Sequence, residues 1–119
     1  MQTMPGTVVI QVFAKAPQAG YAKTRLVPVL GAQGAAELQR GMITRTLQML
    51  SDSTSWPLQL WCAPDCSHSL FQCRADDPRI SLHRQTGRDL GERMQRALAY
   101  ALRSCERAIL VGTDCPGLQ

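Results

Sequence analysis

Along this chain, short runs of apolar residues, which are typical of strands, alternate with segments whose apolar residues recur at helical spacing. Apolar runs fall at residues 7–14, 57–63, 79–83 and 107–112. The first run, Val8-Val-Ile-Gln-Val-Phe13, is apolar at almost every position. That pattern is typical of a strand covered on both faces of a parallel sheet. We expect four strands, with the 79–83 strand near an edge of the sheet.

Helical spacing fills the segments between these runs. Residues 32–51 predict a long helix, residues 67–74 a short one, and residues 89–103 a third. Asp89 followed by Glu92 is a capping-box pattern at the start of the third helix. We expect the following apolar faces: Ala35, Leu38, Met42, Thr46, Met49 and Leu50 in the first helix, and Leu90, Met94, Ala97, Leu98, Ala101 and Leu102 in the third.

The alternation of strands and helices defines the predicted fold class. It favours an α/β protein with a mostly parallel sheet and right-handed crossovers, a Rossmann-like arrangement of three α/β/α layers. The expected strand order is 3-2-1-4. With 119 residues and no internal linker, residues 1–119 are predicted to form a single domain.

Composition narrows the class of ligand and the compartment. The net charge of +4 suits an anionic ligand, but aromatics make up only 5% of the chain, so a nucleic-acid stacking surface is not expected. We find no run of about 20 apolar residues that would span a membrane. The N-terminus has no cationic region typical of a signal peptide, which favours the cytoplasm.

The cysteines point the same way. Their number, five, is odd, which favours reduced thiols. A zinc site is one interpretation of Cys62, Cys66, His68 and Cys73, but they contain no Cys-x-x-Cys pair. Free thiols are the favoured interpretation. A nucleophilic role is one interpretation of Cys115, but no histidine is placed to activate it.

The loop after the first strand carries the strongest chemical signal. Lys15, Lys23 and Arg25 follow the buried strand closely, and a basic, glycine-containing loop at that place is typical of phosphate binding. It is not a P-loop, because Ala22 precedes Lys23, which argues against a P-loop hydrolase. It is not the dinucleotide fingerprint either, since Gly20 stands alone.

Asp114 follows the fourth strand in the same way. In the order 3-2-1-4 the first and fourth strands are neighbours, and ligands bind where the strand order switches. Three cations and one carboxylate would meet there, a layout suited to a diphosphate with Mg²⁺ or Mn²⁺. Each residue also has a simpler interpretation: solvated cations, and a turn or helix cap for Asp114, as for Asp89.

Three motifs together resemble one bacterial family. They are Phe13-Ala-Lys-Ala-Pro-x-x-Gly-x-x-Lys-Thr-Arg-Leu26, Gln85-x-Gly-x-Asp-Leu-Gly-Glu-Arg-Met94 and Gly112-Thr-Asp-Cys-Pro-Gly-Leu118. The chain resembles the transferases found beside radical-SAM and selenium-related genes, within the nucleotide-diphospho-sugar (glycosyltransferase-A) superfamily. The motifs occur in the family's order and span nearly the whole chain.

The resemblance implies site residues one by one. It implies a nucleotide or nucleotide sugar as the ligand and Asp114 as the ligand of Mg²⁺ or Mn²⁺, although a single Asp stands where many relatives have Asp-x-Asp. The residues implied in nucleotide and phosphate binding are Lys15, Gly20, Lys23, Arg25, Gly87, Asp89, Leu90, Gly91 and Arg93.

Members of that family are usually longer than this chain. The resemblance therefore implies an incomplete glycosyltransferase-A fold, the N-terminal part of a glycosyl- or nucleotidyltransferase. The alternative is a non-catalytic nucleotide-binding fragment that lacks the acceptor half. A fourth strand at the margin of the sheet would expose an apolar edge, and pairing of two chains across it is one expected way to cover it.

Overall fold

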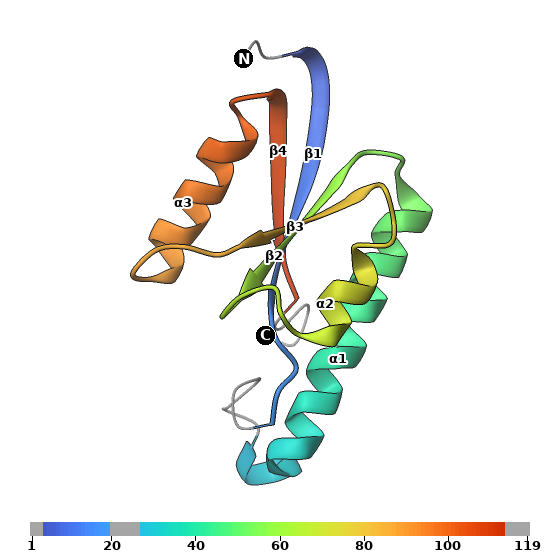
Figure 1. Cartoon of the computed structure of the whole chain (residues 1–119), viewed down its shortest axis with the longest axis vertical. Coiled ribbons are helices and arrows are strands. Elements are labelled where there is room, and N and C mark those ends of the chain that lie inside the picture. The colour runs from blue at the N-terminus through green and yellow to red at the C-terminus, as the bar shows by residue number, and fades with distance from the viewer. Residues whose placement is uncertain (1–3, 20–26, 114–119) are drawn as a thin grey trace.

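The computed structural model describes residues 4–19 and 27–113 of the chain. It is an α/β structure with one sheet of four parallel strands and helices on both faces, as predicted (Figure 1). The strands are β1 (Met4–Lys15), β2 (Leu58–Ala63), β3 (Ile80–Arg84) and β4 (Cys105–Gly112). The helices are α1 (Val27–Ser53), α2 (Ser69–Arg74) and α3 (Leu90–Ala101).

The strand order is β3-β2-β1-β4, which confirms the predicted order 3-2-1-4. The central strand β1 pairs with β2, where Val12 lies opposite Leu60, and with β4, where Val12 lies opposite Val111. β2 pairs on its other side with β3. Both edge strands, β3 and β4, therefore depend on the β1–β2 pair for their position.

The two faces of the sheet bury different side chains. Ile10, Val12 and Ala14 of β1 pack in a cluster with residues of α1 and α2, including Ile43 and Phe71. The opposite face is covered by α3 (Figure 1). There Phe13, Trp61 and Ala97 form a smaller cluster. The prediction that the first strand is covered on both faces is confirmed.

The first helix differs from its prediction in extent and in its buried face. It begins at Val27 rather than at residue 32, and Gly31, with φ of 75°, interrupts the helical backbone near its start. Ala35 and Met42 are buried as predicted, but Leu38 and Met49 are exposed. Gln39, a polar residue, is fully buried on the same side of the helix as Ile43 and Leu47.

Two elements with apolar sequences, β4 and α3, are partly exposed. In β4, Ile109 is 44% exposed, which agrees with the expected place of the fourth strand at the margin of the sheet, since among the described residues β4 pairs with β1 alone. In α3, Ala97 and Ala101 are buried as predicted, whereas Leu90 and Leu102 are exposed. Leu90 is the first residue of the helix, and Leu102 caps its end.

The short helix α2 begins with an unusual cap. The Nδ1 atom of His68 accepts a hydrogen bond from the backbone N–H of Leu70 (3.0 Å). Burial, together with the nearby positive charge of Arg40, lowers the pKa of His68. Both effects favour the neutral imidazole, which is the form that can accept this bond.

Acidification should therefore weaken the fold through His68. The unfolded chain takes up the proton near the ordinary pKa of 6.5, while the folded chain resists it until a lower pH. The free energy of unfolding should fall as pH drops below 6.5, and the loss should be complete below the folded-state pKa. His68→Asn keeps a capping acceptor that does not titrate, so its stability should depend less steeply on pH.

Urea unfolding of both proteins across this pH range tests the prediction. His83, whose pKa burial also lowers, is present in both proteins, so its contribution cancels in the comparison. Parallel stability curves for the two proteins would show that the cap does not titrate with folding.

Candidate functional site

The carboxyl ends of all four strands meet at one edge of the sheet, because every strand pair is parallel. After β1 the chain order runs to β2 and β3 on one side, and β4 joins on the other side. The switch point of the strand order thus lies between β1 and β4, where open α/β sheets bind ligands. Lys15 ends β1 at this point, and its side chain is exposed.

Three hydrogen bonds fix the end of β1. The amide Nε2 of Gln39 on α1 donates to the Lys15 carbonyl oxygen (3.0 Å). The N–H of Ala16 donates to the carbonyl of Ala63 at the end of β2 (2.7 Å). On the other side, Thr113 Oγ1 donates to the Phe13 carbonyl (3.2 Å) and is fully buried. The backbone around Lys15 is therefore held from α1, from β2 and from the residue after β4, while the Lys15 side chain faces solvent.

Gln39 has a further property at this edge. Its Oε1 atom is shielded from solvent and has no hydrogen-bond partner within the part of the chain that the structure describes. A buried acceptor without a donor costs about 1–3 kcal/mol. Gln39 thus donates one hydrogen bond from Nε2 at the end of β1, and its Oε1 atom remains an unused acceptor where the basic loop begins.

The segment after β3 is held against β2. The Gln85 N–H donates to the carbonyl of Cys62 (2.9 Å), and its side-chain Nε2 donates to the carbonyl of Trp61 (2.9 Å). Gln85 is buried, so these two bonds satisfy donors that water does not reach. The loop that leads from β3 into α3 therefore starts from a fixed point at the carboxyl edge.

Gly87 is required by this loop. Its φ of +144° is a conformation that residues with side chains rarely adopt. A Cβ atom at this position would lie 2.8 Å from the backbone nitrogen of Arg93 and 3.0 Å from its Cγ. Arg93 also donates from Nε to the Gly87 carbonyl oxygen (3.1 Å). Two of the implied site residues, Gly87 and Arg93, are thus in direct contact.

Asp89 is the N-cap of α3. Its Oδ1 accepts a hydrogen bond from the N–H of Glu92 (2.8 Å), as the capping pattern predicts. The second half of the expected capping box is different, because Glu92 Oε1 accepts from the N–H of Arg88 rather than of Asp89. Glu92 also forms ion pairs with the Arg88 and Arg96 side chains, both at 3.2 Å.

The remaining residues implied at this helix start have no packing role. Leu90 is 62% exposed at the first position of α3. A Cβ atom on Gly91 would meet only Asp89 Oδ1, at an ordinary contact distance of 3.5 Å. An exposed leucine and an open backbone position leave this side of the helix start accessible.

The structure places the implied residues in two groups along the same edge. Lys15 lies at the end of β1, whereas residues 87–93 follow β3, which is two strands away in the sheet. Gly20, Lys23, Arg25 and Asp114 lie outside the described residues.

Three residues that position this edge received no role from the sequence. Gln85 and Thr113 lie inside the motifs that carry the family resemblance, directly after β3 and β4. Gln39 is a polar residue within the buried face of a helix, and such a position is itself a signal for a specific hydrogen bond. All three act by holding backbone carbonyls at strand ends.

The cysteines do not gather into a metal site. In residues 4–19 and 27–113 no group of three or more His, Cys, Asp or Glu side chains is arranged to hold a metal ion. Cys62 and Cys66 pack in the same cluster, while Cys73 is exposed on α2. The favoured interpretation of free thiols agrees with the four cysteines described here.

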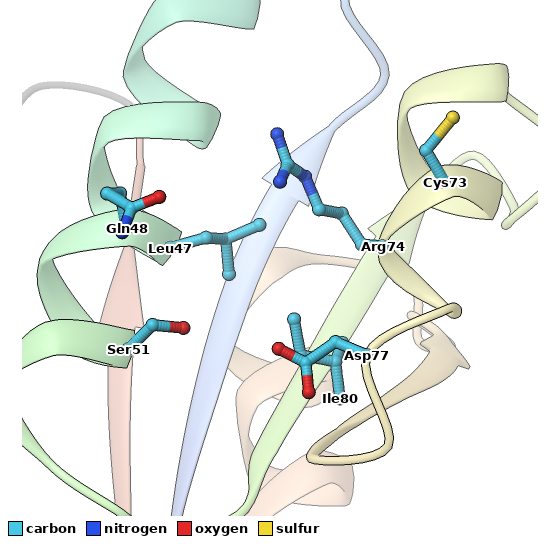
Figure 2. Close-up of a pocket in the computed structure, with 7 residues that line it drawn as sticks. All are labelled: Leu47, Gln48, Ser51, Cys73, Arg74, Asp77 and Ile80. Atoms are coloured by element: carbon cyan, nitrogen blue, oxygen red, sulfur yellow. The ribbon is translucent and has the colours of Figure 1, made fainter.

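A cavity of about 260 Å³ lies away from the carboxyl edge. It opens between α1, α2 and the first residue of β3, Ile80 (Figure 2). Arg74 and Asp77 reach into it, and the Nε atom of Arg74 is buried without a partner in the described part of the chain. Because Ile80 begins β3, this cavity is near the amino ends of the strands and separate from Lys15.

A solved protein shares this fold. The chain matches a solved protein from Desulfovibrio desulfuricans, described as a "putative nucleotide-diphospho-sugar transferase", with a TM-score of 0.78 and 33% identity over 92% of this chain. The chain spans 48% of the length of that protein. No curated protein matches the chain.

A protein-family model also matches the chain. Residues 46–119, more than half of the chain, match the family described as "Uncharacterized protein conserved in bacteria (DUF2064)". The chain belongs to this family. In the part of the chain that the structure describes, no helix is long and apolar enough to cross a membrane.

Gly87→Ala should destabilise the protein. The positive φ and the 2.8 Å approach to Arg93 must both be relieved, at a cost of about 1–3 kcal/mol. Gly41→Ala is the matched control, since it lies in α1 with nothing within 4 Å, and should be neutral or stabilising by up to about 1 kcal/mol. Urea unfolding measures both, and equal stabilities of the two variants would contradict the requirement for glycine.

Proposed function

We propose that this chain binds the nucleotide-diphosphate donor of a glycosyl- or nucleotidyltransferase at the carboxyl edge of its sheet. The observation that carries the proposal is the 33% identity, over 92% of the chain, to a protein described as a nucleotide-diphospho-sugar transferase. The placement of Lys15 at the switch point supports it independently, because that is where ligands of such sheets bind.

The phosphate groups are assigned to the basic loop. Lys15 is exposed at the end of β1 and its backbone is fixed by Gln39, so its ammonium group works from a rigid base. Lys23 and Arg25 follow in the same loop. Cations at this position would neutralise the diphosphate oxygens, and the arginine could bind two oxygens at once.

The nucleoside is assigned to the start of α3. Leu90 offers an exposed apolar side chain there, and Gly91 leaves room for a close approach. Arg93 and Gly87 hold the loop in shape through the 3.1 Å bond between them. Asp89 already serves as the helix cap, so its share in binding would be to keep this segment in place.

Asp114 is assigned to a divalent cation, Mg²⁺ or Mn²⁺. Mg²⁺ is commonly held by one or two carboxylates together with substrate phosphates, so a single aspartate is a sufficient protein ligand. Thr113, the residue before it, is anchored to β1 by its 3.2 Å bond to Phe13. A bound cation would supply charge stabilisation to the diphosphate.

The chemistry that follows is group transfer with a phosphate leaving group. Fixed positive groups stabilise the charge that develops on a diphosphate or pyrophosphate as a nucleophile attacks. The attacked atom is the C1 atom of a sugar in glycosyl transfer and the α-phosphorus in nucleotidyl transfer. In both reactions the loop of Lys15, Lys23 and Arg25 serves the leaving group.

Binding without transfer is the second candidate. It rests on the assignments above, which give residues to a donor nucleotide and a cation and none to an acceptor. A panel of nucleoside diphosphates and nucleotide sugars with Mn²⁺ and Mg²⁺ in a thermal-shift assay identifies the ligand in either case. Turnover of the stabilising nucleotide sugar supports the transferase, and stabilisation without turnover supports the binding domain.

Lys23→Ala and Lys15→Ala should each weaken binding of the panel's best nucleotide about tenfold or more, because each removes a charge-assisted contact to phosphate. Arg107→Ala is the control, since Arg107 is exposed near the start of β4, at the opposite end of the strand. Calorimetry measures all three. Unchanged affinity in both lysine variants would exclude the phosphate role of the loop.

Asp114→Asn should remove the dependence of nucleotide binding on Mn²⁺ or Mg²⁺, since the amide lacks the charge that holds the cation. Calorimetry with and without the metal gives the ratio of affinities for the parent and the variant. A variant that keeps the parent's metal dependence would reject the assignment of Asp114.

A further inference from the structure

Two cysteines lie together at the carboxyl edge of the sheet. Cys62 is the penultimate residue of β2 and is fully buried, and Cys66 follows four positions later, in the turn before α2. Cys66 is half-buried and packs against the cluster that contains Cys62. One thiol is therefore shielded from solvent, and its neighbour is open to it.

The segment between the two thiols is held at several points. The carbonyl of Ala63 accepts from the Ala16 N–H (2.7 Å), and the carbonyl of Pro64 accepts from Arg84 Nε (3.1 Å). Gln72 Nε2 donates to the Cys66 carbonyl (2.6 Å). These bonds fix the backbone of the segment, and both cysteine side chains pack in the same apolar cluster.

The two thiols also influence each other. Burial raises the pKa of the Cys62 thiol, and the neighbouring Cys66 raises it further. Cys62 therefore stays protonated, and Cys66, which is partly exposed, is the member of the pair that can meet a solute. An accessible thiol beside a second, shielded thiol is an arrangement in which a sulfenic acid can be converted into a disulfide.

We propose that Cys62 and Cys66 form a modification site, in which a peroxide converts the two thiols into an intramolecular disulfide. Neither thiol has a place in the proposed donor site, and the pairing does not depend on what that edge binds. The oxidant is a hydroperoxide, with hydrogen peroxide as its simplest member.

The reaction balances in two steps. The Cys66 thiolate attacks one peroxide oxygen, the O–O bond breaks, and the product is a sulfenic acid with release of one water after protonation. The Cys62 sulfur then attacks the Cys66 sulfur, the S–O bond breaks, and the departing hydroxide takes the Cys62 proton to form a second water. The two sulfur atoms lose the two electrons that the peroxide gains.

The other described cysteines do not share this arrangement. Cys73 is exposed on α2, and Cys105 lies at the start of β4, at the opposite edge of the sheet from Cys62. Cys73 is thus the matched control, because it is an accessible thiol in the same part of the chain and does not belong to the cluster that contains Cys62 and Cys66.

Treatment of the native protein with hydrogen peroxide tests the site. We expect the unfolded, oxidised chain to titrate with two fewer free thiols out of its five. Cleavage before Asp65 and after Phe71 separates Cys62, Cys66 and Cys73 into different peptides. The peptide ending at Pro64 should be recovered linked to the peptide 65–71, with a mass lower by two hydrogen atoms, and dithiothreitol should release it.

Variants distinguish this pair from general oxidation. Cys73→Ser should form the same link, and Cys66→Ser should lose it and keep the Cys62 thiol free. In Cys62→Ala the sulfenic acid of Cys66 has no resolving partner, so dimedone should label Cys66 more heavily than in the parent. A parent in which Cys62 stays reduced, or links to another cysteine, overturns the proposal, as does unchanged dimedone labelling in Cys62→Ala.

Discussion

The burial of β1 on both faces, with a parallel neighbour on each side, is the constraint on which the rest of the structure depends. Val12 and Phe13 lie on opposite faces of the sheet. The helices α1 and α2 cover the face of Val12, and α3 covers the face of Phe13. Burying such side chains contributes about 1.5–3 kcal/mol each, so the strand cannot shift by one residue without exposing both sets. The same pairing brings the carboxyl ends of all four strands to one edge and puts Lys15 at the switch point.

Buried polar side chains fix the backbone at that edge. Gln39, Gln85 and Thr113 are buried, and each donates to a backbone carbonyl near the end of a strand. Burying an amide or hydroxyl costs free energy unless it is hydrogen-bonded, and an apolar residue would fill the same space without that condition. The bonds therefore specify position more than they add stability, and they leave the neighbouring side chains open to solvent.

The sequence predicted the type and order of the elements because hydrophobic periodicity records which faces are covered. It predicted the Asp89 cap for a local reason, since a cap depends on residues only three positions apart. It failed for Leu38 and Met49, because a polar residue, Gln39, takes a buried position on α1 that hydrophobic periodicity does not assign. The partial exposure of β4 agrees with the predicted place of the fourth strand at the margin of the sheet. The Gly87–Arg93 contact was also beyond reach, because it exists only after the loop has folded back onto α3.

The acidic groups at the edge explain why its cations remain available. Asp89 is committed to the N–H of Glu92, and Glu92 is committed to Arg88 and Arg96. Asp65 accepts from the Ser67 N–H, and hydrogen bonds from Ser67 lower its pKa, so it stays ionised within its own turn. Across the described ranges 4–19 and 27–113, Lys15 and Arg93 consequently form no ion pair. Local pairing occupies these carboxylates, and the positive charge that remains would suit the phosphate groups of the proposed donor.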